Sequence, residues 1–171
     1  MNQVLRYLPL SLLVVLLDQA TKYWAYYNLR FKPDVHVINS FFKLSYAENP
    51  GIAFGVLSDT GGNAKVWLLS AVSFVAISLV TYFAYHAPPT KKLLLVALTL
   101  ILGGIIGNLI DRLHLQVVID FIEIYVNDYH WPTFNIADMA ICIGAALLSI
   151  DILKESNEVI SETDSNKVKT T

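Results

Sequence analysis

The sequence predicts an all-α polytopic membrane protein with four transmembrane helices plus a small extramembrane β-rich cradle. Hydrophobic residues make up 55% of the chain and charged residues only 15%, and the mean hydropathy is +0.53. The apolar residues gather in four long runs, each close to the roughly 20 residues that cross a bilayer core. With 171 residues the chain has the size of one domain.

The predicted helices cover residues of about 6–27, 66–86, 92–112 and 135–154. The second and third contain long uncharged runs, Val66–Tyr85 and Leu93–Ile110. The first spans the membrane only if it tolerates Asp18 and Lys22, and the fourth only if it tolerates Asp138. The first could also be a secretory leader, but no small-residue cleavage site follows its apolar run, so we expect an uncleaved span.

Four antiparallel spans place the long segments 28–65 and 113–134 on one side of the membrane. The tight connection between the second and third helices and both termini then lie on the other side. Hydrophobic alternation in Val35–Ile38 and Phe41–Tyr46 predicts a small sheet at the membrane surface.

The charged and polar residues indicate the orientation of the chain in the membrane and the end of the transmembrane domain. Lys91 and Lys92 fall in a very short loop, which favours cytoplasmic termini because short cytoplasmic loops are rich in lysine and arginine. We expect residues 1–155 to form the transmembrane domain and residues 156–171 to form a disordered polar cytoplasmic tail. A net charge of −2 gives no reason to expect nucleic acid as a partner.

The intramembrane charges converge on one leaflet. Asp18 lies roughly 18 Å of helix beyond Arg6, and Asp111 lies roughly 28 Å beyond Lys92. Asp138 lies about one turn inside the same face, because the fourth helix starts there. Ionisable groups within a membrane are costly, so this convergence predicts a single functional site.

Two groups of these residues have the spacing of structural clamps. Asp18 and Lys22 are at i and i+4, the favourable order for an ion pair. Asn108, Asp111 and Arg112 are at i, i+3 and i+4, so we expect Arg112 to keep Asp111 ionised.

Asp120 and Asp138 have no cation nearby in the sequence, and apolar residues surround both. Two carboxylates in a desolvated site do not both ionise easily, so one can act as a base while the other keeps a proton. Each could also be a helix cap or a loop carboxylate. His114 and His130 lack metal-ligand spacing, and we expect no metal or cofactor.

Small residues suggest two local features. Gly103 and Gly107 have the spacing that lets membrane helices pack closely. The run Asn49-Pro50-Gly51 predicts a turn, with a polar role for Asn49 as the second interpretation.

Taken in order, these motifs resemble the lipoprotein signal peptidases (signal peptidase II). The resemblance extends over about 120 residues and rests on five blocks: Asp18-Gln19-Ala20-Thr21-Lys22, Asn49-Pro50-Gly51-Ile52-Ala53-Phe54, Gly103 to Arg112, Val118-Ile119-Asp120-Phe121 and Phe134-Asn135-Ile136-Ala137-Asp138. Ile52 departs from the alanine that is frequent in the family, but the polar positions are intact.

The resemblance implies a four-helix inner-membrane aspartyl peptidase that acts without a cofactor. Its substrate would be a prolipoprotein whose signal peptide is cut off before a diacylglyceryl-modified cysteine. Asp120 and Asp138 would form the catalytic dyad, and the substrate-binding or supporting residues would be Asn49, Asn108, Arg112, Asn135, Asp111, Asp18 and Lys22. The resemblance also implies membrane lipid as a partner and inhibition by the cyclic peptide globomycin, and we expect a monomer.

Two other functions are compatible with the composition. A transporter or proton channel would use the intramembrane acids as relays, but it needs polar groups in both leaflets. A scaffold held by glycine-mediated packing would tolerate the loss of Asp120 or Asp138.

Overall fold

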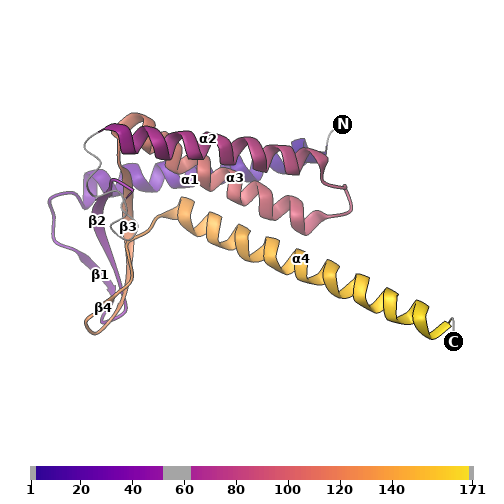
Figure 1. Ribbon diagram of the computed structural model, residues 1–171. Helices are drawn as coiled ribbons and strands as arrows, with labels where there is room; N and C mark the ends of the chain where they lie inside the picture. Colours follow the sequence, from indigo (N-terminus) through magenta and orange to yellow (C-terminus); the bar gives the residue numbers. More distant parts are fainter. Residues whose placement is uncertain (1–2, 52–62, 170–171) are drawn as a thin grey trace.

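The computed structural model describes residues 3–51 and 63–169, in which four helices alternate with the strands of a small sheet. The elements are α1 (Gln3–Asn28), β1 (Val35–Ile38), β2 (Phe42–Asn49), α2 (Asn63–His86), α3 (Lys92–Leu115), β3 (Val118–Val126), β4 (Tyr129–His130) and α4 (Ile136–Lys169). In Figure 1 the sheet stands across one end of the bundle, and α4 diverges from the other helices toward its C-terminal end.

Within the described residues, three helices are long and apolar enough to cross a membrane: Ala64–His86, Lys92–Leu115 and Ile136–Ser156. The helix α1 has 26 residues, which is long enough, but Asp18 and Lys22 interrupt the apolar run of its sequence. The predicted helices and the small sheet are therefore confirmed as elements, while a fourth membrane span stays a prediction.

The helix α3 is central to the bundle and contacts each of the other three helices. Its glycines make this possible. A Cβ atom on Gly104 would lie 2.4 Å from the carbonyl oxygen of Ala137 in α4, and one on Gly107 would lie 2.6 Å from Oδ2 of Asp18 in α1. The close packing predicted from Gly103 and Gly107 is thus confirmed, and the space at Gly107 is occupied by a carboxylate.

The sheet is antiparallel, in the order β1-β2-β3-β4. Its strands β1 and β2 lie where the alternating sequence predicted a small sheet. Leu44 of β2 pairs with Ile122 of β3, and a bulge follows before Ala47 pairs with Asp120. Phe121 packs with Ala25 of α1 in a buried apolar cluster. These contacts attach β3 to the bundle and place Asp120 where the strands meet the helices.

The helix α4 continues to Lys169, whereas the sequence analysis expected a helix end near residue 154 and a disordered tail over 156–171. The physical reason is local: residues 155–169 contain no proline or glycine, and glutamate and lysine are good helix formers. Ile52, the position that departs from the resembled family, lies outside the described residues, as does the rest of 52–62 within the predicted 28–65 surface segment.

Candidate active site

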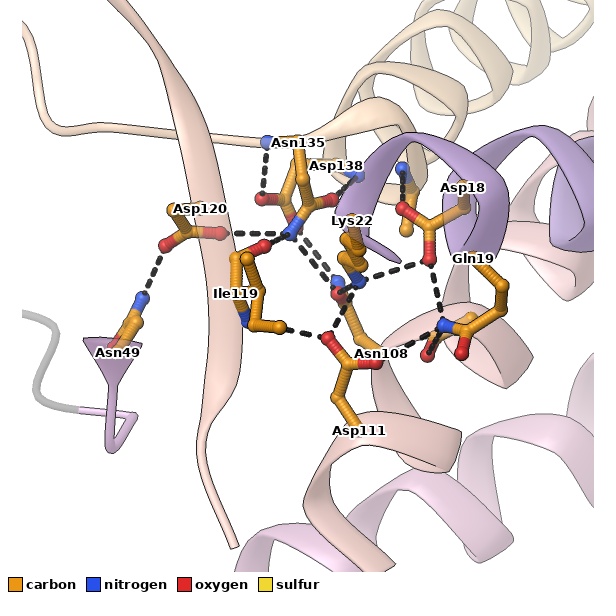
Figure 2. Close-up of polar contacts among 12 residues, drawn as sticks. Asp18, Gln19, Lys22, Asn49, Asn108, Asp111, Ile119, Asp120, Asn135 and Asp138 are labelled. Atoms are coloured by element: carbon orange, nitrogen blue, oxygen red, sulfur yellow. Dashed lines mark hydrogen bonds and ion pairs between the residues drawn. The ribbon is translucent and has the colours of Figure 1, made fainter. Parts of the chain in front are cut away.

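The end of the bundle beside the sheet holds a connected set of polar side chains (Figure 2). They come from α1, α3, β3 and the start of α4, and Asn49 joins them from the end of β2. We call the following residues the buried network: Asp18, Gln19, Lys22, Asn108, Asp111, Asp120, Asn135 and Asp138. All residues that the sequence predicted for the site, except Arg112, are linked to it by hydrogen bonds or ion pairs.

Lys22 is the cation at the centre of the network. Its Nζ lies 2.8 Å from Oδ2 of Asp18 and 2.9 Å from Oδ2 of Asp111, and it donates a hydrogen bond of 2.9 Å to Oδ1 of Asn108. Only 2% of Lys22 is exposed, and Asp18 is fully buried. The predicted pairing of Asp18 with Lys22 is confirmed, but the single ammonium group is shared between two carboxylates.

Arg112 does not form the predicted clamp with Asp111. No ion pair or hydrogen bond joins Arg112 to Asp111 or Asn108 in the part of the chain that the structure describes, and the buried Nε of Arg112 has no partner there. Lys22, from a different helix, takes the place that the spacing assigned to Arg112. The guanidinium still lies close enough to Asp138, Asp111 and Asp120 for coulombic interactions.

Gln19 belongs to the network although the sequence analysis did not select it. Its Nε2 donates to Oδ2 of Asp18 at 3.2 Å, to the carbonyl oxygen of Gly107 at 3.1 Å and to Oδ1 of Asp111 at 3.0 Å. The sequence did contain a signal for Gln19, because its amide follows Asp18 directly within an apolar run. Two backbone N–H groups were also missed: Ala137 donates to Asp18, and Ile119 donates to Asp111.

Asn108 connects the Lys22 cluster to the two remaining aspartates. Its Oδ1 accepts from Lys22 at 2.9 Å and from Nδ2 of Asn135 at 3.2 Å. Its Nδ2 donates to Oδ1 of Asp138 at 2.7 Å. The amide is thereby fixed in one orientation, since the lysine requires an oxygen and the carboxylate requires a donor.

Asn135 and Asp138 form a reciprocal cap at the start of α4. The N–H of Asp138 donates to Oδ1 of Asn135 at 2.9 Å, and the N–H of Asn135 donates to Oδ2 of Asp138 at 3.3 Å. Asp138 is therefore a helix cap, as one interpretation proposed, and it also accepts the bond from Asn108. Both functions hold its carboxylate in place.

Asp120 is held by an amide on each oxygen. Nδ2 of Asn135 donates to Oδ1 at 2.7 Å, and Nδ2 of Asn49 donates to Oδ2 at 3.0 Å. Oδ1 of Asn49 accepts from the N–H of Gly51 at 2.8 Å, so the predicted turn orients this amide. Gly51 has a φ of 81°, a conformation that glycine adopts without strain.

The surroundings of Asp120 stabilise its neutral form more than water stabilises that of an exposed aspartate. The residue is only 1% exposed. Burial raises its pKa from the ordinary 3.8 to about 6; the nearby charge of Asp138 also raises it, against the opposing hydrogen bonds from Asn49 and Asn135. The side-chain amide of Asn135 donates to the carboxyl group of Asp120, and its backbone N–H donates to that of Asp138, so one residue connects the two acids.

An apolar cavity of about 530 Å³ opens beside Asp138. Apolar side chains dominate its wall, including those of Ile124, Trp131, Phe134 and Met139. A carboxylate at the edge of such a cavity can meet an apolar ligand that carries one polar bond to be attacked.

The described residues contain no group of three or more histidine, cysteine, aspartate or glutamate side chains arranged to hold a metal ion. The chemistry available to these side chains is acid–base chemistry between paired carboxyl groups.

Comparisons with known proteins agree with the motifs. The family model described as signal peptidase (SPase) II matches residues 10–154. The lipoprotein signal peptidase of Pseudoalteromonas atlantica is 42% identical over 91% of this chain and 93% of its own length. That of Photorhabdus laumondii is 44% identical over 90% of this chain and 91% of its own.

A solved structure has the same fold. It is a bacterial membrane enzyme determined by the in meso method at 2.3 Å, with a TM-score of 0.77 and 30% identity. The match covers 86% of this chain and 87% of that one. From the matching model, the relatives and this shared fold, we conclude that the chain belongs to the signal peptidase II family of proteases.

Proposed function

We propose that the protein is an intramembrane aspartyl endopeptidase that removes the signal peptide from diacylglyceryl-modified prolipoproteins. It would cut directly before the lipidated cysteine. The observation that carries this proposal is the pair Asp120 and Asp138 at the edge of an apolar cavity. Both carboxyl groups accept hydrogen bonds from Asn135, that of Asp120 from the side chain and that of Asp138 from the backbone. The family membership supplies the class of substrate.

In the proposed reaction, one aspartate removes a proton from a water molecule while the resulting hydroxide attacks the scissile carbonyl carbon. The other aspartic acid donates its proton to the carbonyl oxygen, and a tetrahedral diol forms. The carbon–nitrogen bond then breaks as the first aspartic acid passes its proton to the leaving amine. The other aspartate takes a proton back from a diol hydroxyl, so a carboxylic acid and an amine are released and the pair is restored. The resting proton belongs to the pair rather than to either residue.

The supporting residues act through position and charge. Asn108 and Asn135 fix the two carboxyl groups, and Lys22 fixes Asn108. Asn49 holds the outer oxygen of Asp120, and Arg112 lies close enough to both acids to stabilise negative charge. The cavity beside Asp138 would receive an apolar part of the substrate that enters sideways from the membrane.

We further propose that the protein spans the inner membrane four times as a monomer. The termini and the tail would face the cytoplasm, and the dyad would lie near the periplasmic face. Lys91 and Lys92, at the short α2–α3 connection, support this orientation because short cytoplasmic loops are rich in lysine and arginine. The apolar spans support the location in a membrane. Membrane lipid would surround the spans, and globomycin is expected to inhibit cleavage.

The test is a gel-shift assay with purified protein in detergent and a diacylglyceryl-modified prolipoprotein. Asp120→Asn and Asp138→Asn should each abolish detectable cleavage, a loss on the order of 10⁴-fold or more, while the parent should stay active with a chelator present. Asp34→Asn is the matched control, because Asp34 pairs with Lys43 on the sheet, away from the buried network.

Robust turnover by either dyad variant would refute the assignment. A folded parent that cleaves nothing would favour the transporter or scaffold functions instead. Sensitivity of the parent to the chelator would contradict a metal-independent mechanism.

A further inference from the structure

Two adjoining cavities lie at the end of the bundle opposite the aspartates. The first is polar, has a volume of about 370 Å³, and is lined by Lys91, Lys92 and Lys154 together with the acids Asp151 and Glu155. The second is apolar, has a volume of about 400 Å³, and lies among residues of α2, α3 and α4. Neither belongs to the buried network.

Neighbouring residues of two helices line the two cavities. In α3, Leu93 lines the polar cavity and Leu94 the apolar one; in α4, Asp151 lines the polar cavity and Ile152 the apolar one. The apolar cavity continues along α3 to Leu98, one turn farther from the loop. A basic cavity at the end of the helices therefore lies next to an apolar cavity that extends toward the middle of the bundle.

The polar cavity carries an excess of positive charge. Nζ of Lys91 pairs with Oε2 of Glu155 at 3.1 Å, which ties the α2–α3 connection to α4. Apart from this pair, the lining contains two lysines, Lys92 and Lys154, and one carboxylate, that of Asp151. The site as a whole favours an anion.

The apolar helices around the cavity indicate which kind of anion it would bind. The helices α2, α3 and α4 are apolar enough to span a membrane, so a groove on their surface meets lipid chains. Basic pockets between transmembrane helices on the cytoplasmic side suit the phosphate of lipid headgroups. A lipid also explains the order of the two cavities, because its headgroup and its chains are joined end to end.

We propose that this two-part cavity binds one anionic phospholipid, with its phosphate at Lys92 and Lys154 and an acyl chain along Leu94, Leu98 and Leu148. The lipid would fill the space between α4 and its neighbours at the end where α4 diverges from the bundle (Figure 1). It would thereby hold α4 in position from the side opposite Asp138.

The test is native mass spectrometry of the delipidated protein in detergent, titrated with phosphatidylglycerol or with phosphatidylcholine of the same chains. The parent should bind one phosphatidylglycerol at least about tenfold more tightly than phosphatidylcholine, since each basic residue near an anionic headgroup contributes about 1 kcal/mol. The double variant Lys92→Gln/Lys154→Gln should lose this preference. Lys32→Gln, on the sheet side, is the matched control and should keep it.

A second variant tests the groove without changing charge. Leu148→Trp should fill the apolar cavity and weaken phosphatidylglycerol binding about tenfold, while its unfolding midpoint in lipid-free detergent should match that of the parent. Equal binding of the two lipids, loss of binding in Lys32→Gln, or full binding by Leu148→Trp would overturn the proposal. Competition by glycerol 3-phosphate as effective as that by the lipid would also overturn it, because a free phosphate would then be the ligand.

Discussion

Two lysines of this protein each lie between two carboxylates, yet in different surroundings. Lys22 contacts its two aspartates at 2.8 and 2.9 Å inside the helix bundle. Lys43 of β2 contacts Asp34 at 2.7 Å and Glu123 at 3.1 Å on the sheet. We call Asp34, Lys43, Ser45, Glu123 and His130 the sheet cluster, since Ser45 and His130 also bond to Glu123.

Burial separates the two arrangements. The side chain of Lys22 is 2% exposed, whereas that of Lys43 is 14% and that of Asp34 is 39% exposed. Water therefore reaches Asp34 and, to a smaller extent, Lys43 and the 11%-exposed side chain of Glu123, but the ions of the buried network depend on one another and on amides. The same chemical pattern thus serves as a local surface contact in one place and as the support of the candidate active site in the other.

The largest effect should come from removing the buried cation. Lys22→Met leaves Asp18 and Asp111 without a counter-ion, so the free energy of unfolding should fall by about 3–5 kcal/mol. Thermal unfolding in detergent measures this. Asp111→Asn added to Lys22→Met should recover part of the loss; a double variant less stable than the single one would refute the shared-ion explanation.

Asn135→Ala should affect cleavage more than stability. The variant loses the cap of α4, which costs about 1 kcal/mol. It also frees one oxygen of the Asp120 carboxyl group, which should lower kcat about 100-fold. A cleavage time course with a thermal melt tests both values. Ser45→Ala, which removes one bond to Glu123 in the sheet cluster, is the control and should leave cleavage unchanged.

The two regions should respond to pH in opposite directions. The pKa of Asp120 is raised to about 6, so the folded state binds more protons than the unfolded state between about pH 4 and 6, and stability should fall as pH rises through this window. Burial raises the pKa of Glu123, but hydrogen bonds from His130, Lys43 and Ser45 outweigh it and the net pKa is lowered. Its contribution is present above the ordinary value of 4.5 and is lost as pH falls below it.

Unfolding midpoints from pH 3 to 7 separate the two contributions. Asp120→Asn should remove the decline between about pH 4 and 6, and Glu123→Gln should flatten the acid side. An unchanged profile in Asp120→Asn would mean that another group titrates in that window.

The smallest effect should come from Lys43→Met. Its partners are partly hydrated, so the free energy of unfolding should change by about 0–1 kcal/mol, and cleavage should be unaffected. A loss as large as that of Lys22→Met in the same thermal assay would show that burial is not what distinguishes the two lysines.

Local spacing predicted some contacts of the buried network and missed others. Asp18 and Lys22 are one helical turn apart, and they pair as expected. Asp111 pairs with Lys22 rather than with its sequence neighbour Arg112, because the close approach of α1 and α3 at Gly107 brings the lysine within reach. The choice between two cations thus depended on packing between helices, which spacing within one helix does not contain.

The sequence by itself determined the order of the helices, the alternation that forms the sheet, and the end of the bundle at which the polar residues gather. These follow from hydrophobic periodicity and from helical rise, which are local properties. Only the tertiary structure decided that the side chain of Asn135 reaches Asp120, and that Gln19 reaches Asp111. Those contacts join four separate elements, and the bulge in β2 and the glycines of α3 set the distances between them.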